Sequence, residues 1–151
     1  MREKRIITAA LTGSIHTPGM SPYLPVTPEQ LIAEAVRAYE AGAAVAHVHV
    51  RNPETGLPCA DQDLFRTVAA GIKERCDMVV CCTTGGRLGE PVENRVRVVN
   101  SLSPELATLN AGSLNFALFH IADNYTEWKH DWEKNYLAAS EDFIFPNTFL
   151  T

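Results

Sequence analysis

The sequence predicts an α/β fold with a parallel sheet, because apolar runs typical of buried strands alternate with segments of helical periodicity. Strands that are buried on both faces have nearly continuous apolar sequences. Four such runs occupy residues 5–12, 43–50, 78–83 and 105–110. Repeated βα units imply parallel pairing with helical crossovers. Two architectures fit this pattern, an open doubly wound sheet and part of a (β/α)8 barrel, whose complete form needs about 200 residues or more.

The segments between these runs carry helix signals. Thr27 can cap a helix, Pro28 suits its first position, and Gln30 can close a capping box. Gly42 is a typical residue for the end of this helix. Further helices are expected over residues 61–75 and 91–102. No Gly-x-Gly-x-x-Gly follows a predicted strand, which argues against an open dinucleotide-binding sheet.

The last third of the chain is less regular. Residues 116–140 contain four aromatic side chains among charged residues and are predicted to form a helical insertion that packs these aromatics on the body: Tyr125, Trp128, Trp132 and Tyr136. Residues 142–145 fit a fifth strand or an extended loop. With 151 residues the whole chain, 1–151, is expected to form one domain.

Composition excludes several classes of protein. A hydrophobic content of 46% indicates a folded chain, and a net charge of -5 argues against nucleic acid as a partner. No apolar run is long enough to span a membrane, and residues 6–11 are too short for a signal sequence, so a cytoplasmic protein is expected. The cysteines form no Cys-x-x-Cys pair and are predicted to be buried reduced thiols: Cys59, Cys76, Cys81 and Cys82.

The strongest functional signal is the pair His47 and His49. Residues two apart on a strand point to the same side, so both imidazoles are expected to face one cavity. The pair lies at the carboxyl end of a predicted strand, where parallel α/β proteins place their sites. Neutral imidazole is a good zinc ligand. We therefore predict that both bind a catalytic Zn²⁺; the alternative is two histidines hydrogen-bonded in a polar interior.

A catalytic zinc usually has three protein ligands and one open position. The candidates for the third ligand have no motif to support them: His16, Cys81, Cys82 and Glu90. A third ligand from a segment outside these residues is therefore favoured.

Other polar groups follow the same predicted edge of the sheet. Thr83, Gly85 and Gly86 end the third run, where hydroxyls and backbone N–H groups can hold a carboxylate or carbonyl oxygen. Thr108 and Asn110 share a face at the end of the fourth run. For each group, a purely structural role in a turn is an equally weighted alternative.

The loop after the first run is expected to lie over the same mouth. It contributes Ser14 as a candidate substrate contact, with Ile15 and His16 as candidates for specificity. Arg51 directly follows the histidine strand. It is expected either to meet a substrate carboxylate or CoA phosphate, or, as slightly favoured, to pair with an acidic neighbour.

These motifs, in this order, resemble the β-keto acid cleavage enzymes, typified by the 3-keto-5-aminohexanoate cleavage enzyme. The matching pieces are Ile-Thr-Ala-Ala-Leu-Thr-Gly at 7–13, Leu-Pro-Val-Thr-Pro-Glu at 24–29, Ala-Gly-Ala at 41–43, His-Val-His-Val-Arg at 47–51, Thr-Thr-Gly-Gly at 83–86 and the segment 104–116. The resemblance covers nearly the whole chain except the aromatic insertion.

The resemblance implies a zinc-dependent (β/α)8 TIM barrel that exchanges an acyl group between a β-keto acid and acetyl-CoA, giving acetoacetate and a new CoA ester. By position, His47 and His49 match two zinc ligands. Thr83 matches a hydroxyl that contacts the keto acid, and Gly86, Thr108 and Asn110 fall in the segments around it. The third ligand, a glutamate, and the acid/base residues belong to the second half of the family's barrel. The chain therefore resembles a truncated first half, expected to form a homo-oligomer or to pair with a C-terminal half.

One departure concerns the substrate. The amino-keto acid enzyme carries a glutamate on the loop after its first strand, where this chain has Ile15. A different β-keto acid is therefore expected. Two alternatives remain open: another zinc-dependent hydrolase of the amidohydrolase kind, and an inactive half-barrel that binds metal.

Overall fold

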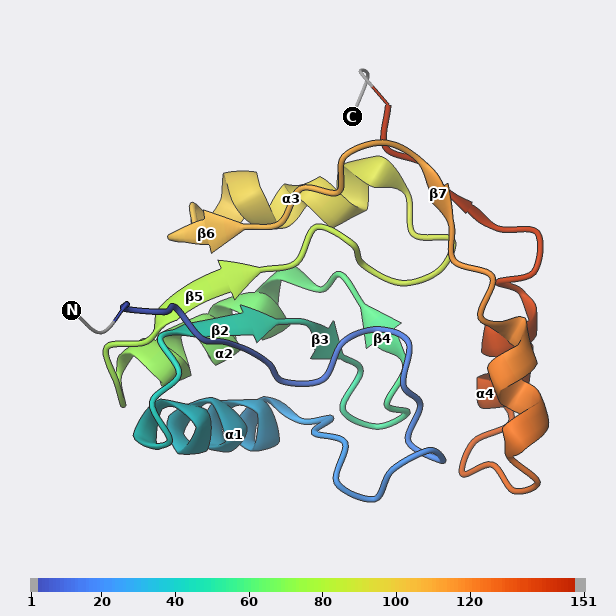
Figure 1. The fold of residues 1–151 in the computed structure, drawn as a ribbon, viewed down its shortest axis with the longest axis horizontal. Helices are drawn as coiled ribbons and strands as arrows, with labels where there is room; N and C mark the ends of the chain where they lie inside the picture. Colours follow the sequence, from blue (N-terminus) through green and yellow to red (C-terminus); the bar gives the residue numbers. More distant parts are fainter. Residues whose placement is uncertain (1–2, 149–151) are drawn as a thin grey trace.

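The computed structural model describes residues 3–148 and is built around a parallel sheet. The sheet has the order β1-β2-β5-β6 (Figure 1). Its strands are β1 (Thr8–Ala10), β2 (Val45–Val48), β5 (Val79–Cys82) and β6 (Leu106–Ala107). All three neighbouring pairs are parallel, and the register aligns Ala10, His47, Cys81 and Leu106 across the sheet. The predicted parallel α/β class is therefore confirmed.

Three helices connect the strands: α1 (Pro28–Glu40), α2 (Gln62–Lys73) and α3 (Val92–Leu102). The predicted start of α1 is confirmed, because Thr27 Oγ1 accepts from the Gln30 N–H while the Gln30 side chain accepts from the Thr27 N–H. Gly42 follows the helix with a φ of +99°, a left-handed conformation that favours glycine.

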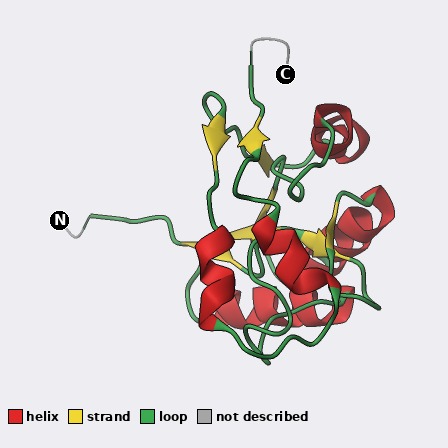
Figure 2. Ribbon diagram, turned by 90° about the vertical axis from the view of Figure 1, so that its right-hand side faces the viewer, coloured by secondary structure: helices red, strands yellow, loops and turns green. Residues whose placement is uncertain are grey.

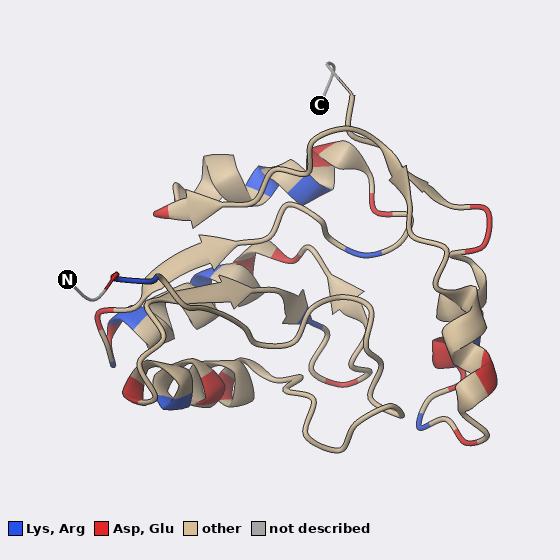
Figure 3. Cartoon of the chain, in the orientation of Figure 1, with Lys and Arg blue, Asp and Glu red and all other residues tan. Residues whose placement is uncertain are grey.

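The main core lies between the sheet and its helices. Side chains of β2 and β5 that face the helices alternate with those that face away, so Val48 and Cys82 enter the core while His47 lies on the opposite face. The buried helix residues that complete this core include Leu31, Ala35, Phe65, Val68, Ile72 and Val98. Strands β2 and β5 carry no charged residue, and the charges are concentrated on helices and loops (Figure 3).

The strands are shorter than the sequence predicted. Ile6 and Ile7 are 80% and 56% exposed, so the first run is an edge of the sheet and not a strand buried on both faces. The second run is interrupted at His49, after which β3 (Val50–Arg51) pairs antiparallel with β4 (Pro58–Cys59). The apolar sequence of each run continues beyond the residues that hydrogen-bond to a neighbouring strand. The predicted strands were therefore longer than the observed ones.

The aromatic segment beyond the sheet contains two short helical pieces, the 3₁₀ helix η1 (Phe119–Asn124) and α4 (Trp132–Ala138). Helix α4 lies beyond the carboxyl end of β2 (Figure 1). Residues 142–145 contain β8 (Ile144–Phe145), which pairs antiparallel with β7 (Leu114–Asn115). This pair lies near the C-terminal end of the described chain (Figure 2), so residues 142–145 are not a fifth strand of the parallel sheet.

Across residues 3–148, no helix combines the length and the apolar character needed to cross a membrane. The four cysteines are all free thiols: Cys59, Cys76, Cys81 and Cys82. Burial raises the pKa of the Cys82 thiol to about 11, with a further contribution from Cys81. Burial is confirmed for Cys81 and Cys82, whereas Cys59 and Cys76 are only half-buried, against the expectation.

Candidate active site

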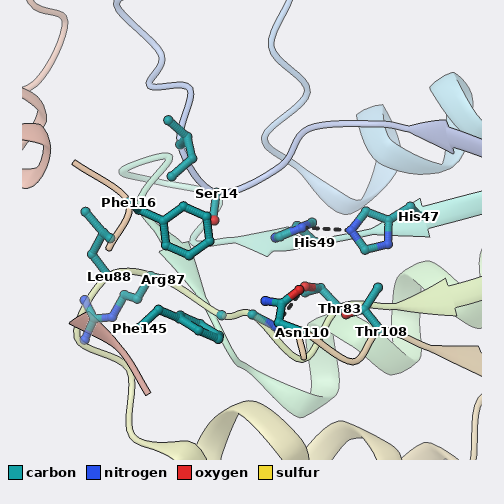
Figure 4. A pocket seen from close by; sticks show the side chains of 13 residues that line it. Ser14, His47, His49, Thr83, Arg87, Leu88, Thr108, Asn110, Phe116 and Phe145 are labelled. Atoms are coloured by element: carbon teal, nitrogen blue, oxygen red, sulfur yellow. Dashed lines mark hydrogen bonds between the residues drawn. The ribbon is translucent and has the colours of Figure 1, made fainter. Parts of the chain in front are cut away.

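A cavity of about 170 Å³ lies at the carboxyl ends of the parallel strands. Nine of its lining residues are ones that the sequence singled out: Ser14, Ile15, His47, His49, Thr83, Gly85, Gly86, Thr108 and Asn110. Figure 4 shows their side chains converging from separate strands and loops. The structure therefore brings together residues that lie almost 100 positions apart in the sequence.

The two histidines meet edge to face in this cavity. Their Nε2 atoms are 3.1 Å apart, and the ring planes are inclined at 81°. Burial lowers the pKa of His47. Burial also lowers the pKa of His49, to about 3, with smaller contributions from the charges of His47 and Arg51. The pair is therefore neutral near pH 7, the protonation state in which imidazole binds metals.

The converging nitrogens fit a shared metal ion. Two nitrogens bound to one tetrahedral zinc at ~2.0–2.1 Å would lie about 3.3 Å apart. The observed separation of 3.1 Å is close to that value and equally fits the alternative, a hydrogen bond between the two rings. Among residues 3–148, however, no third His, Cys, Asp or Glu joins the pair.

Each suggested third ligand lies elsewhere. His16 is an exposed residue that does not line the cavity, and Cys82 is buried in the core. Cys81 pairs in register with His47 but is absent from the cavity lining. Glu90 binds Arg87 and Asn94 instead. None of these four residues therefore joins the histidine pair, and a third ligand from elsewhere stays a prediction.

The segment that follows β5 is held by its own hydrogen bonds. Thr83 is buried, and its hydroxyl accepts from the Gly85 N–H at 3.0 Å. Gly86 has a φ of +61°, and a Cβ there would lie 3.0 Å from Cγ of Arg95. The close approach and the backbone conformation together explain the glycine.

Thr108 and Asn110 differ in their surroundings although both line the cavity. The Thr108 hydroxyl accepts from the Thr84 N–H at 3.0 Å, and the Thr84 hydroxyl donates to the Thr108 carbonyl at 2.7 Å. Thr108 therefore ties the ends of β5 and β6 together. The Asn110 side chain forms no hydrogen bond with the described residues, which leaves its amide available to a ligand.

Arg51 lies outside the cavity and pairs with no Asp or Glu among the described residues, so its structural role rests on carbonyl groups in place of the expected acidic neighbour. Its guanidinium is fully buried and donates to the Thr12 hydroxyl and to the carbonyls of Gly13, His16 and Gly56 at 2.7–2.9 Å. Burial lowers its pKa to about 10, so the group is still charged near neutral pH. Arg51 fixes the loop that carries Ser14.

The other end of the cavity is largely apolar, and the sequence did not indicate it. Leu88, Phe116 and Phe145 line it together with Ile15, and Arg87 adds a charged group (Figure 4). The rings of Phe116 and Phe145 meet edge to face at 5.6 Å because β7 pairs with β8. A pairing between strands about thirty residues apart has no local sequence signal.

Buried Arg95 supports this apolar end from behind. It packs over the Phe145 ring at 4.1 Å and donates to the Pro146 carbonyl at 2.7 Å and the Thr84 carbonyl at 3.3 Å. It links the segment after β5 to the segment after β8. The sequence does not indicate this role, since an arginine in a helix is usually exposed.

Comparison with known proteins identifies the family. The model of the beta-keto acid cleavage enzyme family matches residues 4–150. The chain belongs to this family. It is 45% identical, over 98% of its length, to the 3,5-dioxohexanoate:acetyl-CoA acetone transferase of Paraburkholderia graminis. It is 41% identical, over 77% of its length, to the 3-keto-5-aminohexanoate cleavage enzyme of Fusobacterium nucleatum. These alignments cover 48% and 42% of the two relatives, so the chain spans about half their length.

Solved structures agree on the fold. The ternary complex of ObcA with a C4-CoA adduct and oxalate superposes with a TM-score of 0.56, at 21% identity, over 80% of this chain and 36% of the other. The parallel sheet and helices of the chain thus correspond to part of a (β/α)8 barrel. The barrel reading is confirmed over the open doubly wound sheet.

Proposed function

We propose that the chain contributes the metal- and keto acid-binding part of a zinc-dependent β-keto acid cleavage enzyme. In that reaction an acyl group is exchanged between a β-keto acid and acetyl-CoA, giving acetoacetate and a new CoA ester. The observation that carries the proposal is the approach of the two Nε2 atoms to 3.1 Å in a cavity at the carboxyl ends of parallel strands. Family membership supports the same reaction class.

The proposed roles follow from where each group lies. His47 and His49 would hold the zinc, which when bound supplies a Lewis acid for the keto carbonyl. Thr83 and Asn110 would orient the substrate's oxygen atoms. Gly85 offers close backbone approach beside them. Neutral histidines in a partly water-excluded cavity bind the metal without first losing a proton.

The substrate class follows from the two ends of the cavity. The polar end holds the histidines and Thr83, and the other end presents Ile15, Phe116 and Phe145 to the acyl tail. No Asp or Glu among the described residues lines the cavity, so a tail amine would find no counter-charge there. We therefore propose a β-keto acid whose tail carries no positive charge. The 45% identical relative is named for 3,5-dioxohexanoate, a keto acid without an amine.

The two edges of the sheet carry exposed apolar side chains, which indicate that a partner covers them. Ile6 and Ile7 beside β1 are exposed, as are Leu106 and Leu109 in and after β6. Exposed apolar sheet edges promote association. We propose that these edges are covered by further strands, either from a C-terminal half of the barrel or from a second copy of the chain.

The first test measures zinc by elemental analysis in the purified protein and in a His47→Ala, His49→Ala double variant. We expect zinc to copurify with the protein and to be lost in the variant. A matched double variant, His120→Ala, His130→Ala, removes two histidines outside the cavity and should retain the metal. Equal zinc in both variants, or none in the parent protein, would contradict the proposed site.

The same samples then test the reaction. Acetoacetate formation is measured with acetyl-CoA and either 3,5-dioxohexanoate or 3-keto-5-aminohexanoate. When a C-terminal half of the barrel supplies the remaining ligand and the acid/base residues, we expect zinc-dependent turnover. It should favour the substrate with the uncharged tail by about tenfold or more, since an amine buried without a partner is costly. Zinc binding without turnover of any β-keto acid would indicate the inactive metal-binding half-barrel.

A further inference from the structure

Helix α4 makes a bridging contact at the mouth of the cavity. The Tyr136 hydroxyl donates to the Ser14 carbonyl at 3.0 Å and accepts from the Leu88 N–H at 3.2 Å. Ser14 belongs to the loop after β1, and Leu88 to the loop after β5. One oxygen atom thus joins two loops that both line the cavity but are more than 70 residues apart in the sequence.

The residues around Tyr136 fix its position. Its ring meets the Trp132 ring edge to face at 5.7 Å, and the Trp132 indole N–H donates to the Thr55 carbonyl at 3.1 Å. Glu133 is fully buried, and its carboxylate accepts from the backbone N–H groups of Gly19 at 2.7 Å and His130 at 2.8 Å. Helix α4 is therefore attached to the body at sites independent of the Tyr136 hydroxyl.

The bridge matters for the cavity because the side chains on the two loops face the ligand space. Ser14 and Ile15 come from the first loop, and Arg87 and Leu88 from the second. The Leu88 N–H has no other hydrogen-bond acceptor among the described residues, so the hydroxyl supplies its partner. Loss of the hydroxyl would leave the second loop free to move away from the first.

We propose that Tyr136 is a positioning residue that holds these two loops at a fixed separation and so preorganises the cavity. The loop-fixing role stands on the geometry alone, whereas its benefit to a β-keto acid rests on the function proposed above. A preorganised cavity binds its ligand more tightly because less freedom is lost on binding. The helical insertion then positions two loops of the cavity in addition to packing on the rest of the chain.

The test compares Tyr136→Phe with the parent protein by amide hydrogen exchange. The phenyl ring keeps the packing on Trp132, so the core should exchange at the parent rate. We expect the Leu88 amide to exchange about five- to tenfold faster, because it loses its one acceptor among the described residues. Peptides covering residues 13–17 should change less, since Arg51 also holds that loop. Tyr125→Phe is the matched control, because that hydroxyl makes no hydrogen bond within residues 3–148 and its ring packs on Trp128.

Unchanged exchange at Leu88 would overturn the proposal, as would faster exchange spread evenly over the core, which would indicate general destabilisation. Kinetics give a second readout: we expect a KM for the β-keto acid about five- to tenfold higher with a smaller change in kcat. A parent protein that binds no zinc would refute the proposed function, yet the exchange experiment would still decide the role of Tyr136.

Discussion

A single residue, Arg51, holds the loop that carries Ser14. Its buried guanidinium donates to four backbone carbonyls and one hydroxyl and has no carboxylate partner among the described residues. Removing one side of such an interaction leaves buried acceptors unsatisfied. We expect Arg51→Met to lower the free energy of unfolding by about 3 kcal/mol, measured by urea denaturation.

Arg66→Met is the control for that measurement. Arg66 pairs with Asp63 on the exposed face of α2, where such pairs contribute about 0.5 kcal/mol or less. An Arg51→Met variant as stable as this control would show that the buried hydrogen bonds contribute little.

The sequence could predict the histidine pair but not the groups behind it. The spacing of His47 and His49 places both on one side of a strand whatever surrounds that strand. The roles of Arg51 and Arg95 depend on carbonyl groups brought from distant loops, and the apolar end depends on the pairing of β7 with β8. Such features have no local signature.

At the scale of elements, α1 is the one whose start the sequence specified most fully. Both halves of its capping box are present, with Thr27 Oγ1 accepting from the Gln30 N–H at 3.3 Å. We expect Thr27→Ala to lower the free energy of unfolding by about 1 kcal/mol, measured by thermal or urea denaturation. Thr67→Ala, in the exposed middle of α2, is the control and should be neutral or slightly stabilising, because alanine favours helix. Equal effects of the two variants would contradict the role of the cap.

Helices were easier to predict than strands for a physical reason. Capping and periodicity are local, so the ends of α1 and α2 fell within a few residues of their expected positions. A strand ends where its neighbours stop pairing. Strand β6 is reduced to Leu106–Ala107 although the apolar pattern extended over 105–110, and β1 is reduced in the same way. The sequence of a strand does not show how many of its residues will pair with the neighbouring strand.

At the scale of the whole molecule, the parallel sheet within the described chain has two edges, β1 and β6. Exposed Ile6 and Ile7 lie beside the first, and Leu106 and Leu109, the latter 82% exposed, lie at the second. Unpaired backbone groups next to apolar side chains are the feature that drives edge-to-edge association of strands. The family explains the arrangement, since its relatives are about twice as long.

These edges predict how the 151 residues behave in solution. We expect light scattering to give an average mass that rises with concentration, as the edges pair with one another in the absence of a covering half. An Ile7→Lys, Leu109→Lys variant should shift this association to concentrations about tenfold higher or more, because a charge at each edge opposes strand addition. Exposed Tyr23→Lys adds a charge away from the edges and should leave the association unchanged. A monomer at every concentration would contradict the prediction that the exposed edges drive association. Equal effects of the edge variant and of Tyr23→Lys would mean that net charge, and not the edges, governs association.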